Sequence, residues 1–225
     1  MSANIIKAIG VIIFAYLVGS LNFAVIFSKI FTGRDVRKEG SGNAGTTNML
    51  RSVGKLPAAL TFVFDALKGF VACFAGKTVF THILENGGNA EIFVPIYGAY
   101  LCCVAVMLGH IYPVFFGFKG GKAVACSVGT FAVCCPIAII LGLVGFAVCL
   151  AVSKIVSLSS LVATVIVVGV ATIYCFVSPA VDYNVIPAVI LILMAGLIVF
   201  IKHKDNIVRL ANGTEKKISA KKENK

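Results

Sequence analysis

The first apolar segment, Ile5–Ile30, reads IIKAIGVIIFAYLVGSLNFAVIFSKI and decides the class of protein. A helix needs about 20 predominantly apolar residues to cross the hydrocarbon core of a bilayer, and this segment exceeds that length. It is also longer than the apolar region of a secretory signal peptide, and no small-residue cleavage site follows it before the charged loop. We therefore expect a first membrane span rather than a cleaved leader.

Further apolar segments follow along the chain. Pro136 divides one long apolar region, because a proline interrupts a helix. The expected helices after the first are Leu56–Phe80, Ile92–Leu108, a short one at Ala123–Cys134, Ile137–Ser153, Leu158–Val177 and Val185–Ile201. The sequence therefore predicts an all-α polytopic integral membrane protein with about seven transmembrane helices. If Ala123–Cys134 is re-entrant, about five or six helices cross the membrane.

The composition agrees with a membrane protein. The 225 residues are 59% hydrophobic and only 13% charged, with a mean hydropathy of +1.00, whereas soluble domains carry about 25% charged residues. A net charge of +11 would suit nucleic acid in a soluble protein. Here the apolar segments leave no soluble domain to present a basic face. We therefore predict membrane lipid as a partner and no nucleic acid, while the oligomeric state stays unknown from the sequence.

Positive charges gather in alternate loops, which predicts the orientation in the membrane. The first, third and fifth loops and the C-terminal segment carry most of the 20 Lys and Arg residues. The second and sixth loops carry mainly the acidic side chains Glu85, Glu91 and Asp182. Because Lys and Arg favour the cytoplasmic side, the N-terminus is expected outside and the C-terminus in the cytoplasm. Residues 1–216 are expected to form one membrane domain, followed by a basic polar tail, 217–225.

The eight cysteines are expected to be unpaired and buried. They lie almost entirely within apolar segments and form no CxxC pair, and the adjacent pairs 102–103 and 134–135 are poorly placed to form disulfides. Buried thiols behave as small hydrophobic groups. Neither they nor the three histidines have the spacing of metal ligands. We therefore predict no metal and no cofactor.

The polar stretch Glu39–Arg51, EGSGNAGTTNMLR, is the first candidate binding site. Its glycines permit positive φ and close approach of backbone N–H groups to a ligand, and its side-chain donors suit an anion such as phosphate. Gly40–Gly45 matches the dinucleotide pattern GxGxxG, but it follows a charged loop rather than a strand, which excludes that interpretation. The alternative is a flexible loop without a ligand. The candidate residues are Ser41, Gly42, Asn43, Gly45, Thr47, Asn48 and Arg51.

A second polar stretch, Gly109–Lys122, ends in Lys119-Gly120-Gly121-Lys122 directly before an expected helix. Two cations and the free N–H groups of a helix N-terminus suit an anion. The glycine spacing differs from that of a Walker A loop, and no Ser or Thr follows Lys122. The alternative is that the two lysines only anchor the loop to lipid head groups.

The third stretch, His203–Glu215, follows the last expected helix. If that helix continues past Ile201, positions 203, 206 and 209 share a face, which would present His203, Asn206 and Arg209 together. Gly213 then permits a turn before Glu215. The alternative is an ordinary basic segment beside the membrane.

Asp65 and Lys68 lie three residues apart within the second apolar segment. Charges inside a membrane are costly and tend to face the protein interior and to pair. We expect a structural pair that supports the site rather than a catalytic one.

Together these stretches resemble the bacterial acyl-phosphate:glycerol-3-phosphate acyltransferase family, PlsY. The resemblance extends from Gly19 to about Lys217, and the three motifs occur in the family's order and spacing. They are Gly-Ser-Gly-Asn-x-Gly-x-Thr-Asn-x-x-Arg at Gly40–Arg51, Gly-His-x-(Phe/Tyr)-Pro with Phe-Lys-Gly-Gly-Lys at Gly109–Lys122, and His-x-x-Asn-Ile-x-Arg-Leu with Gly-x-Glu at His203–Glu215; Asp65–Gly69 also looks like the family's Asp-x-x-Lys-Gly. The chain departs from the family where Ala123 stands for a usual Gly and Asn22 for a common Pro.

The resemblance implies transfer of a fatty acyl group from acyl-phosphate to the 1-hydroxyl of glycerol 3-phosphate, giving lysophosphatidate and phosphate. It implies a bacterial plasma-membrane enzyme of phospholipid biosynthesis with its site at the cytoplasmic face. Ser41, Arg51, Lys122 and His203 are then expected in catalysis. The expected substrate-binding residues are Gly42, Asn43, Gly45, Thr47, Asn48, Lys119, Gly120, Gly121, Asn206, Arg209, Gly213 and Glu215.

Several alternatives stay open at the level of sequence. Direct attack by the acceptor is favoured over an acyl-enzyme on Ser41, which has no adjacent base in the sequence. Either His203 or a substrate phosphate could act as base. The alternative function is a transporter or channel for a phosphorylated solute, which should show polar groups through the midplane and often an internal repeat. Here the polar groups cluster at one expected face.

Overall fold

Helices account for all the regular structure among the described residues. The structure, a computed structural model, describes residues 1–178 and 182–218, so most of the expected tail 217–225 lies outside the described residues. The elements are α1 (Ser2–Gly19), α2 (Phe23–Thr32), η1 (Val36–Lys38), α3 (Thr46–Ser52), α4 (Lys55–Glu85), α5 (Pro95–Ile111), η2 (Val114–Phe116), α6 (Val124–Cys134), α7 (Pro136–Ser153), α8 (Val156–Val177), α9 (Val185–Lys202) and α10 (Lys204–Ala211). The prediction of an all-α fold is confirmed.

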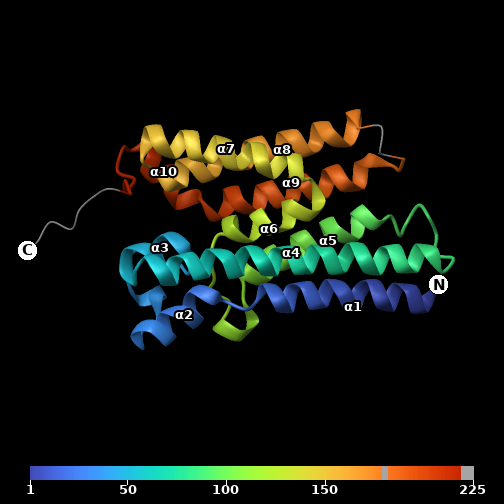
Figure 1. Cartoon of the computed structure of the whole chain (residues 1–225), viewed down its shortest axis with the longest axis horizontal. Coiled ribbons are helices and arrows are strands. Elements are labelled where there is room, and N and C mark those ends of the chain that lie inside the picture. The colour runs from blue at the N-terminus through green and yellow to red at the C-terminus, as the bar shows by residue number, and fades with distance from the viewer. Residues whose placement is uncertain (179–181, 219–225) are drawn as a thin grey trace, which may run out of the picture.

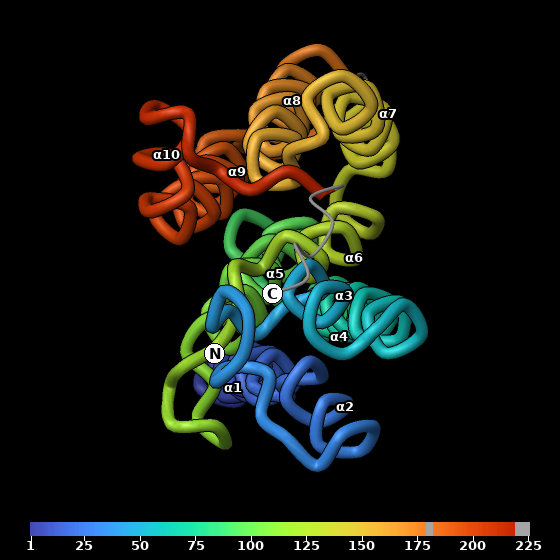
Figure 2. Tube along the Cα trace, turned by 90° about the vertical axis from the view of Figure 1, so that its left-hand side faces the viewer, coloured from blue at the N-terminus to red at the C-terminus, as the bar shows by residue number. Residues whose placement is uncertain are grey.

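The long helices lie side by side along the longest axis of the molecule. In Figure 1, α3 and α10 lie at one end of this axis and the N-terminus lies at the other. Seen from that first end, α7, α8 and α9 form one group, and α1, α4, α5 and α6 form a second (Figure 2). The helices of each group pack extensively on one another, while the two groups meet mainly through α5 with α9 and α6 with α7. This arrangement leaves room for a cavity between the groups at the end that carries α3 and α10.

Small residues bring α4 close to its neighbours. A Cβ on either Gly76 of α4 or Gly98 of α5 would collide with the carbonyl oxygen of the other glycine. A Cβ on Gly129 of α6 would likewise meet the backbone of Ala66 on α4. Small residues at helix crossings are typical of membrane proteins, where close van der Waals packing holds helices together. Helix α4 is thus the centre of the second group.

The first apolar segment is broken, which the sequence analysis did not predict. The expected single helix Ile5–Ile30 is α1 and α2, separated at Ser20–Asn22. Asn22 caps α2, its side-chain oxygen accepting the Val25 N–H at 3.1 Å. Asn22 thus supplies a local signal for a new helix to start at this point. Together Ser2–Thr32 remain one apolar stretch long enough to span a membrane.

Within the described part of the chain, the number of segments able to cross the membrane is lower than the seven expected helices, and α6 accounts for part of the difference. Among the described residues, 5 segments are long and apolar enough to span, and a sixth is added if α9 and α10, bent by 60°, count together. The expected helix Ala123–Cys134 is α6, whose 11 residues rise about 16 Å. A hydrocarbon core is about 30 Å thick, so α6 alone is too short to cross it.

Candidate active site

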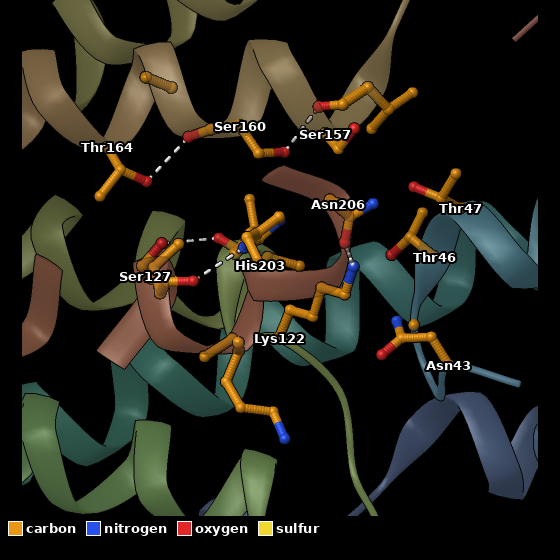
Figure 3. Close-up of a pocket in the computed structure, with 18 of the residues that line it drawn as sticks. Asn43, Thr46, Thr47, Lys122, Ser127, Ser157, Ser160, Thr164, His203 and Asn206 are labelled. Atoms are coloured by element: carbon orange, nitrogen blue, oxygen red, sulfur yellow. Dashed lines mark hydrogen bonds between the residues drawn. The ribbon is translucent and has the colours of Figure 1, made fainter. Parts of the chain in front are cut away.

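A cavity of about 750 Å³ lies between the two groups of helices at the end that carries α3 and α10. Its mouth is lined by polar residues from all three candidate stretches, and it continues between α6, α7, α8 and α9 along apolar side chains. Figure 3 shows Asn43, Thr46 and Thr47 facing Lys122 and Asn206 across this space, with His203 beside them. The fold thus brings together three segments that are far apart in the sequence.

The first stretch is shaped by the amide of Asn48. This buried side chain accepts the Ser41 N–H at 2.9 Å and donates to the carbonyl oxygens of Val36 and Glu39 at 2.9 and 3.0 Å. Gly40 and Gly42 supply the positive φ values, +59° and +72°, that the turn requires. Because the Asn48 amide is engaged within the loop, it holds the loop in shape rather than offering donors to a ligand. Its expected role in binding is therefore indirect.

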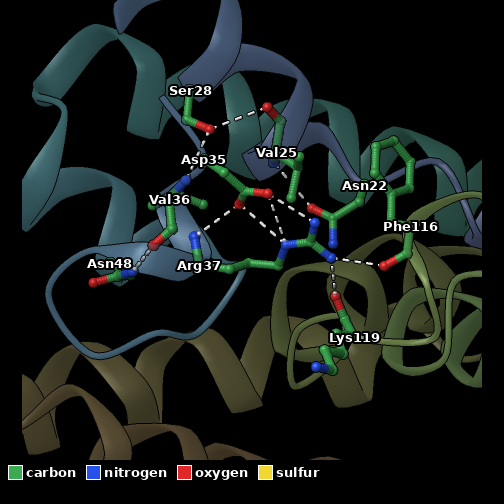
Figure 4. Close-up of polar contacts among 9 residues, drawn as sticks. All are labelled: Asn22, Val25, Ser28, Asp35, Val36, Arg37, Asn48, Phe116 and Lys119. Carbon is green, nitrogen blue, oxygen red and sulfur yellow. Dashed lines mark hydrogen bonds and ion pairs between the residues drawn. The ribbon is translucent and has the colours of Figure 1, made fainter. Parts of the chain in front are cut away.

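Arg37 ties the first stretch to the second, and the sequence analysis missed it (Figure 4). Its guanidinium pairs with Asp35, Nη2 to Oδ2 at 2.7 Å, and its Nη1 donates to the carbonyl oxygens of Phe116 and Lys119 at 2.7 and 3.2 Å. The hydrogen bond from Arg37 is the main reason that the pKa of the Asp35 carboxyl lies below its ordinary value. A single Arg in a basic loop gives no signal of such a role in the sequence.

Lys122 is the cation that the second stretch delivers to the cavity. Its Nζ donates to Asn206 Oδ1 of the third stretch (Figure 3). The preceding turn is fixed by the Gly120 N–H on the Ile111 carbonyl oxygen at 3.1 Å and the Gly121 N–H on the His110 carbonyl oxygen at 3.2 Å. Burial lowers the pKa of Lys122 to about 8, although the nearby Glu215 carboxylate opposes the shift.

The residues of the third stretch are held together by hydrogen bonds to Glu215. Helix α10 does not continue α9 but starts anew after His203, and Gly213 at φ +68° turns the chain back. Glu215 then accepts hydrogen bonds from Ser157 Oγ at 2.8 Å, Asn206 Nδ2 at 2.7 Å and Arg209 Nε at 2.6 Å. Burial alone would raise the pKa of Glu215, but these three hydrogen bonds outweigh it and lower the pKa. Ser157 is a member of this group that the sequence analysis missed.

His203 is buried at the bend between α9 and α10. Its Nδ1 lies 2.8 Å from the Val199 carbonyl oxygen, which can only accept, so Nδ1 carries the proton and Nε2 is the acceptor nitrogen. Burial lowers the pKa of His203 to about 4, and the Lys122 cation contributes to the shift. The imidazole is therefore neutral at physiological pH. It offers a lone pair to a hydroxyl rather than a positive charge to a phosphate.

Most of the expected site residues line this one cavity. They are Ser41, Gly42, Asn43, Gly45, Thr47, Asn48, Arg51, Gly120, Lys122, His203, Asn206, Arg209 and Glu215. Arg51 is exposed at the mouth, where its Nη2 lies 3.4 Å from the Lys216 carbonyl oxygen.

Three expected residues do not line the cavity. Lys119 is exposed and contributes its carbonyl oxygen to Arg37 instead. Gly121 is buried where a Cβ would meet the His110 ring and the Ala44 carbonyl oxygen, and Gly213 only forms the turn before Glu215. Of the two lysines considered for the donor phosphate, the structure brings Lys122 to the site and leaves Lys119 outside it.

The expected pair of Asp65 and Lys68 is confirmed as an ion pair, with both side chains 2% exposed and 2.7 Å between Nζ and Oδ1. Lys68 Nζ also donates to the Leu21 carbonyl oxygen at 2.7 Å, at the break between α1 and α2. Asp65 lies 3.5 Å from His110 Nδ1 on α5. These contacts join three elements beneath the second stretch, as a structural role requires. The eight cysteines are all free, as expected.

Comparison with known proteins gives a consistent result. The model of the family described as glycerol-3-phosphate acyltransferase matches residues 9–213. A glycerol-3-phosphate acyltransferase of Francisella tularensis subsp. novicida is 42% identical over 213 residues, 94% of this chain and 93% of the relative. That of Anaeromyxobacter sp. (strain K) is 36% identical over 219 residues, 97% of this chain and 100% of the relative.

Two solved structures are also similar. Crystal structures of PlsY (YgiH), an integral membrane glycerol 3-phosphate acyltransferase, in the glycerol 3-phosphate form and the lysophosphatidic acid form, match with TM-scores of 0.76 and 0.72. Each is 32% identical in sequence, and the match covers 93% of this chain and 94% of the other. The family model, the identities and the fold agree over nearly the whole length, and the chain belongs to the glycerol-3-phosphate acyltransferase family.

Proposed function

We propose that this protein transfers an acyl group from acyl-phosphate to the 1-hydroxyl of glycerol 3-phosphate, releasing lysophosphatidate and phosphate. The observation that carries the proposal is the cavity, which has cations and polar groups at one end and, along the rest, mostly apolar side chains with a few Ser and Thr residues. Such a cavity suits a donor substrate that has a charged head and an acyl chain. It also suits a small, hydrophilic acceptor at its polar end. Family membership and the solved structures with glycerol 3-phosphate and lysophosphatidic acid support the acceptor and the product.

The phosphate group of the acyl-phosphate binds at the first stretch and at the start of α6. Lys122 stands directly before this helix, and the N–H groups of its first turn add positive partial charge. Lys122 and these N–H groups would act together with Arg51 and the backbone N–H groups after Gly40. They would stabilise negative charge on the carbonyl oxygen of the acyl-phosphate and on the departing phosphate. Ser41, exposed at the mouth of the same cavity, donates a hydrogen bond and forms no covalent intermediate.

The acceptor belongs beside the third stretch. Arg209 clamps its phosphate, and Glu215 fixes Arg209 and Asn206 in place through the hydrogen bonds described above. The 1-hydroxyl donates to Nε2 of His203, which orients it toward the acyl carbonyl carbon.

The reaction is a direct substitution at the acyl carbon. A new bond forms between that carbon and the hydroxyl oxygen, and the bond to the phosphate oxygen breaks. The hydroxyl proton ends on the departing phosphate, which leaves as hydrogen phosphate, because the leaving phosphate is far more basic than His203, whose pKa is about 4.

We propose the cytoplasmic face of the bacterial plasma membrane as the site of this reaction. Most cations lie in the loops and segments at the end of the molecule that carries the cavity mouth. The cavity also reaches Phe62 of α4 and Leu143 of α7, which are 38% and 43% exposed. An amphiphilic donor could pass between these two helices from the lipid, while the acceptor arrives from water.

The test is phosphate release by the purified protein given palmitoyl-phosphate and glycerol 3-phosphate. We expect release that requires both substrates and an organic product that carries the acyl group on glycerol 3-phosphate. The matched control is Lys122→Met, which removes the buried cation and should lower kcat/KM at least about 100-fold, as loss of one transition-state contact does. No release above background with both substrates present would refute the enzyme and would favour transport of a phosphorylated solute.

A further inference from the structure

The apolar part of the cavity has a measurable depth along α8. Residues Val156, Ser157, Ser160, Thr164 and Val167 line it in order from the mouth inward. From Ser157 onward they follow one face of the helix at steps of three or four residues. From Val156 to Val167 the helix rises about 16 Å. One leaflet of a bilayer's hydrocarbon core, which is filled by ordinary long acyl chains, is about 15 Å thick.

The wall along this depth is lined by hydroxyls whose hydrogens are already used. Ser160 Oγ donates to the Val156 carbonyl oxygen at 2.9 Å, Thr164 Oγ1 to that of Ser160 at 2.8 Å, and Ser127 Oγ to that of Val124 at 2.7 Å (Figure 3). Each bond is made within the residue's own helix. No hydroxyl donor on these three side chains is left for a ligand, so the wall accepts an alkyl chain without losing hydrogen bonds.

The lining of the cavity stops part-way along three of the helices around it. On α8, Thr164 is half-buried, Val167 is 7% exposed and Val168 is the last lining residue, whereas Ala171 further along is fully buried and does not line the cavity. On α9, Ala195 lines the cavity and Ile192 does not. On α6, Phe131 is the last lining residue and is 2% exposed. Packed side chains therefore close the inner end.

We infer that this closed end, formed by Val167, Phe131 and Ala195, sets the longest acyl chain that the site accepts. The inference rests on the proposed function and adds the specificity for acyl-chain length, which that function leaves open. A chain that stays in the cavity and exceeds its depth has to displace packed side chains at the inner end, whereas a shorter chain leaves part of the cavity unfilled. Val167 therefore forms part of the inner end of the cavity. Thr164 lies about 12 Å from Val156 along the helix, and a larger side chain at this position would shorten the cavity.

The experiment compares kcat/KM for dodecanoyl-, palmitoyl- and eicosanoyl-phosphate at saturating glycerol 3-phosphate. The unaltered protein should use eicosanoyl-phosphate at least about tenfold less well than palmitoyl-phosphate, since misfit of a few methylenes is worth about that much. Thr164→Phe should lower the palmitoyl-to-dodecanoyl ratio at least about tenfold, and Val167→Ala should raise the eicosanoyl-to-palmitoyl ratio. The matched control is Val165→Phe, which puts the same ring on the neighbouring, 59% exposed position of α8 and should leave the ratios unchanged.

Retained dodecanoyl activity in Thr164→Phe shows that the variant is folded. Equal loss with all three donors, or unchanged ratios in both cavity variants, would overturn the inference while leaving the acyltransferase activity intact. If the unaltered protein handles eicosanoyl-phosphate as well as palmitoyl-phosphate, the chain leaves the cavity for the lipid and the inference is also wrong. Absence of phosphate release with every donor would instead refute the proposed function itself, and the inference with it.

Discussion

The side chain of Lys122 can lose its positive charge near the upper end of the physiological pH range. Its pKa of about 8 means that the charge is present at neutral pH and disappears as the pH rises. An exposed lysine would keep its charge to much higher pH. Partial burial thus strengthens the attraction between the Lys122 charge and a phosphate, because less water screens it. The same burial narrows the range of alkaline pH in which Lys122 is charged.

The first prediction follows from this pKa. Because phosphate binding needs the charged form, kcat/KM should be constant near neutral pH and fall about tenfold per pH unit above about pH 8. In Lys122→Arg the guanidinium stays charged, so this alkaline fall should disappear whatever the absolute rate. Lys119→Arg, at the exposed neighbouring lysine, is the control and should keep the fall of the unaltered protein. An alkaline fall that persists in Lys122→Arg would assign it to another group.

The second prediction separates the two phosphate sites. Arg209 lies on α10 and is held by Glu215 of the third stretch, which we assign to the acceptor, so Arg209→Ala should raise KM for glycerol 3-phosphate at least about tenfold and change KM for the donor little. Steady-state kinetics with each substrate varied in turn provide the measurement. Lys204→Ala, an exposed cation on the same helix, is the control and should leave both constants unchanged. An equal rise in both constants would contradict the assignment of Arg209 to the acceptor.

At the scale of single elements, the two loops before α3 and α6 depend on one another. Arg37 donates to two carbonyl oxygens of the loop that precedes α6 and pairs with Asp35. Removing its side chain leaves these two carbonyl oxygens without their donor and the Asp35 carboxylate with only the backbone N–H of residue 37. The shape of the mouth is therefore set by a residue that does not line the cavity.

The third prediction tests this link. Arg37→Gln should destabilise the protein by about 1–3 kcal/mol, since the half-buried Phe116 carbonyl oxygen and the Asp35 carboxylate lose their charged donor, and should lower kcat/KM with both substrates. Thermal unfolding in one detergent, followed alongside activity, measures both effects. Arg34→Gln is the matched control, because Arg34 is 78% exposed and its contact with Glu39 spans 3.6 Å, which is worth little. Equal behaviour of the two variants would mean that Arg37 is an ordinary surface cation.

The start of α6 carries the one departure from the family that affects the backbone of the site. Ala123, where the family usually has Gly, is fully buried and has φ +62°. A left-handed conformation costs a residue with a Cβ about 1–2 kcal/mol. The surrounding contacts hold the turn despite this cost, and Lys122 reaches the cavity.

The fourth prediction concerns this strain. Ala123→Gly should raise the stability by up to about 1 kcal/mol and leave the pH profile unchanged. Ala125→Gly, in the regular first turn of the same helix, should lower the stability by about 1 kcal/mol. Unfolding temperatures measured in the same detergent compare the two. If both glycines destabilise alike, the turn at Ala123 carries no strain.

The apolar pattern predicted the long helices well because membrane spans are read from length and hydropathy alone. The expected Ile137–Ser153 and Val185–Ile201 differ from α7 and α9 by one residue at one end. The pattern failed where polar contacts decide the local structure. The break at Ser20–Asn22 depends on a cap and on Lys68 from another helix, and the bend at His203 depends on the contacts of Glu215. Such long-range contacts leave no periodic signal in the sequence.

Across the whole molecule, the three polar stretches converge because successive long helices run in opposite directions. The stretches fall in loops that the charge pattern assigns to one face, and this made most of the cavity mouth predictable. The depth of the cavity was not predictable, since Thr164 and Val167 lie in an uninterrupted apolar helix. Nothing in that pattern distinguishes the residues that line a cavity from those that face lipid.

The fifth prediction concerns orientation. Green fluorescent protein fused after Ile218 should fluoresce, and alkaline phosphatase inserted in the loop after Asn86 should be active, because the first point is expected in the cytoplasm and the second outside. The reciprocal fusions are the controls and should be silent. The opposite pattern would place the cavity mouth on the outer face, away from cytoplasmic glycerol 3-phosphate.

The position of Glu215 in the chain has a consequence for biosynthesis. Helices α1 to α10 all precede Glu215 in the chain, so Arg209 and Asn206 are synthesised before the carboxylate that fixes them. Synthesis of the helices and completion of the site are therefore separate events. The site is complete only when the short segment that carries Glu215 has folded back onto Ser157 of α8.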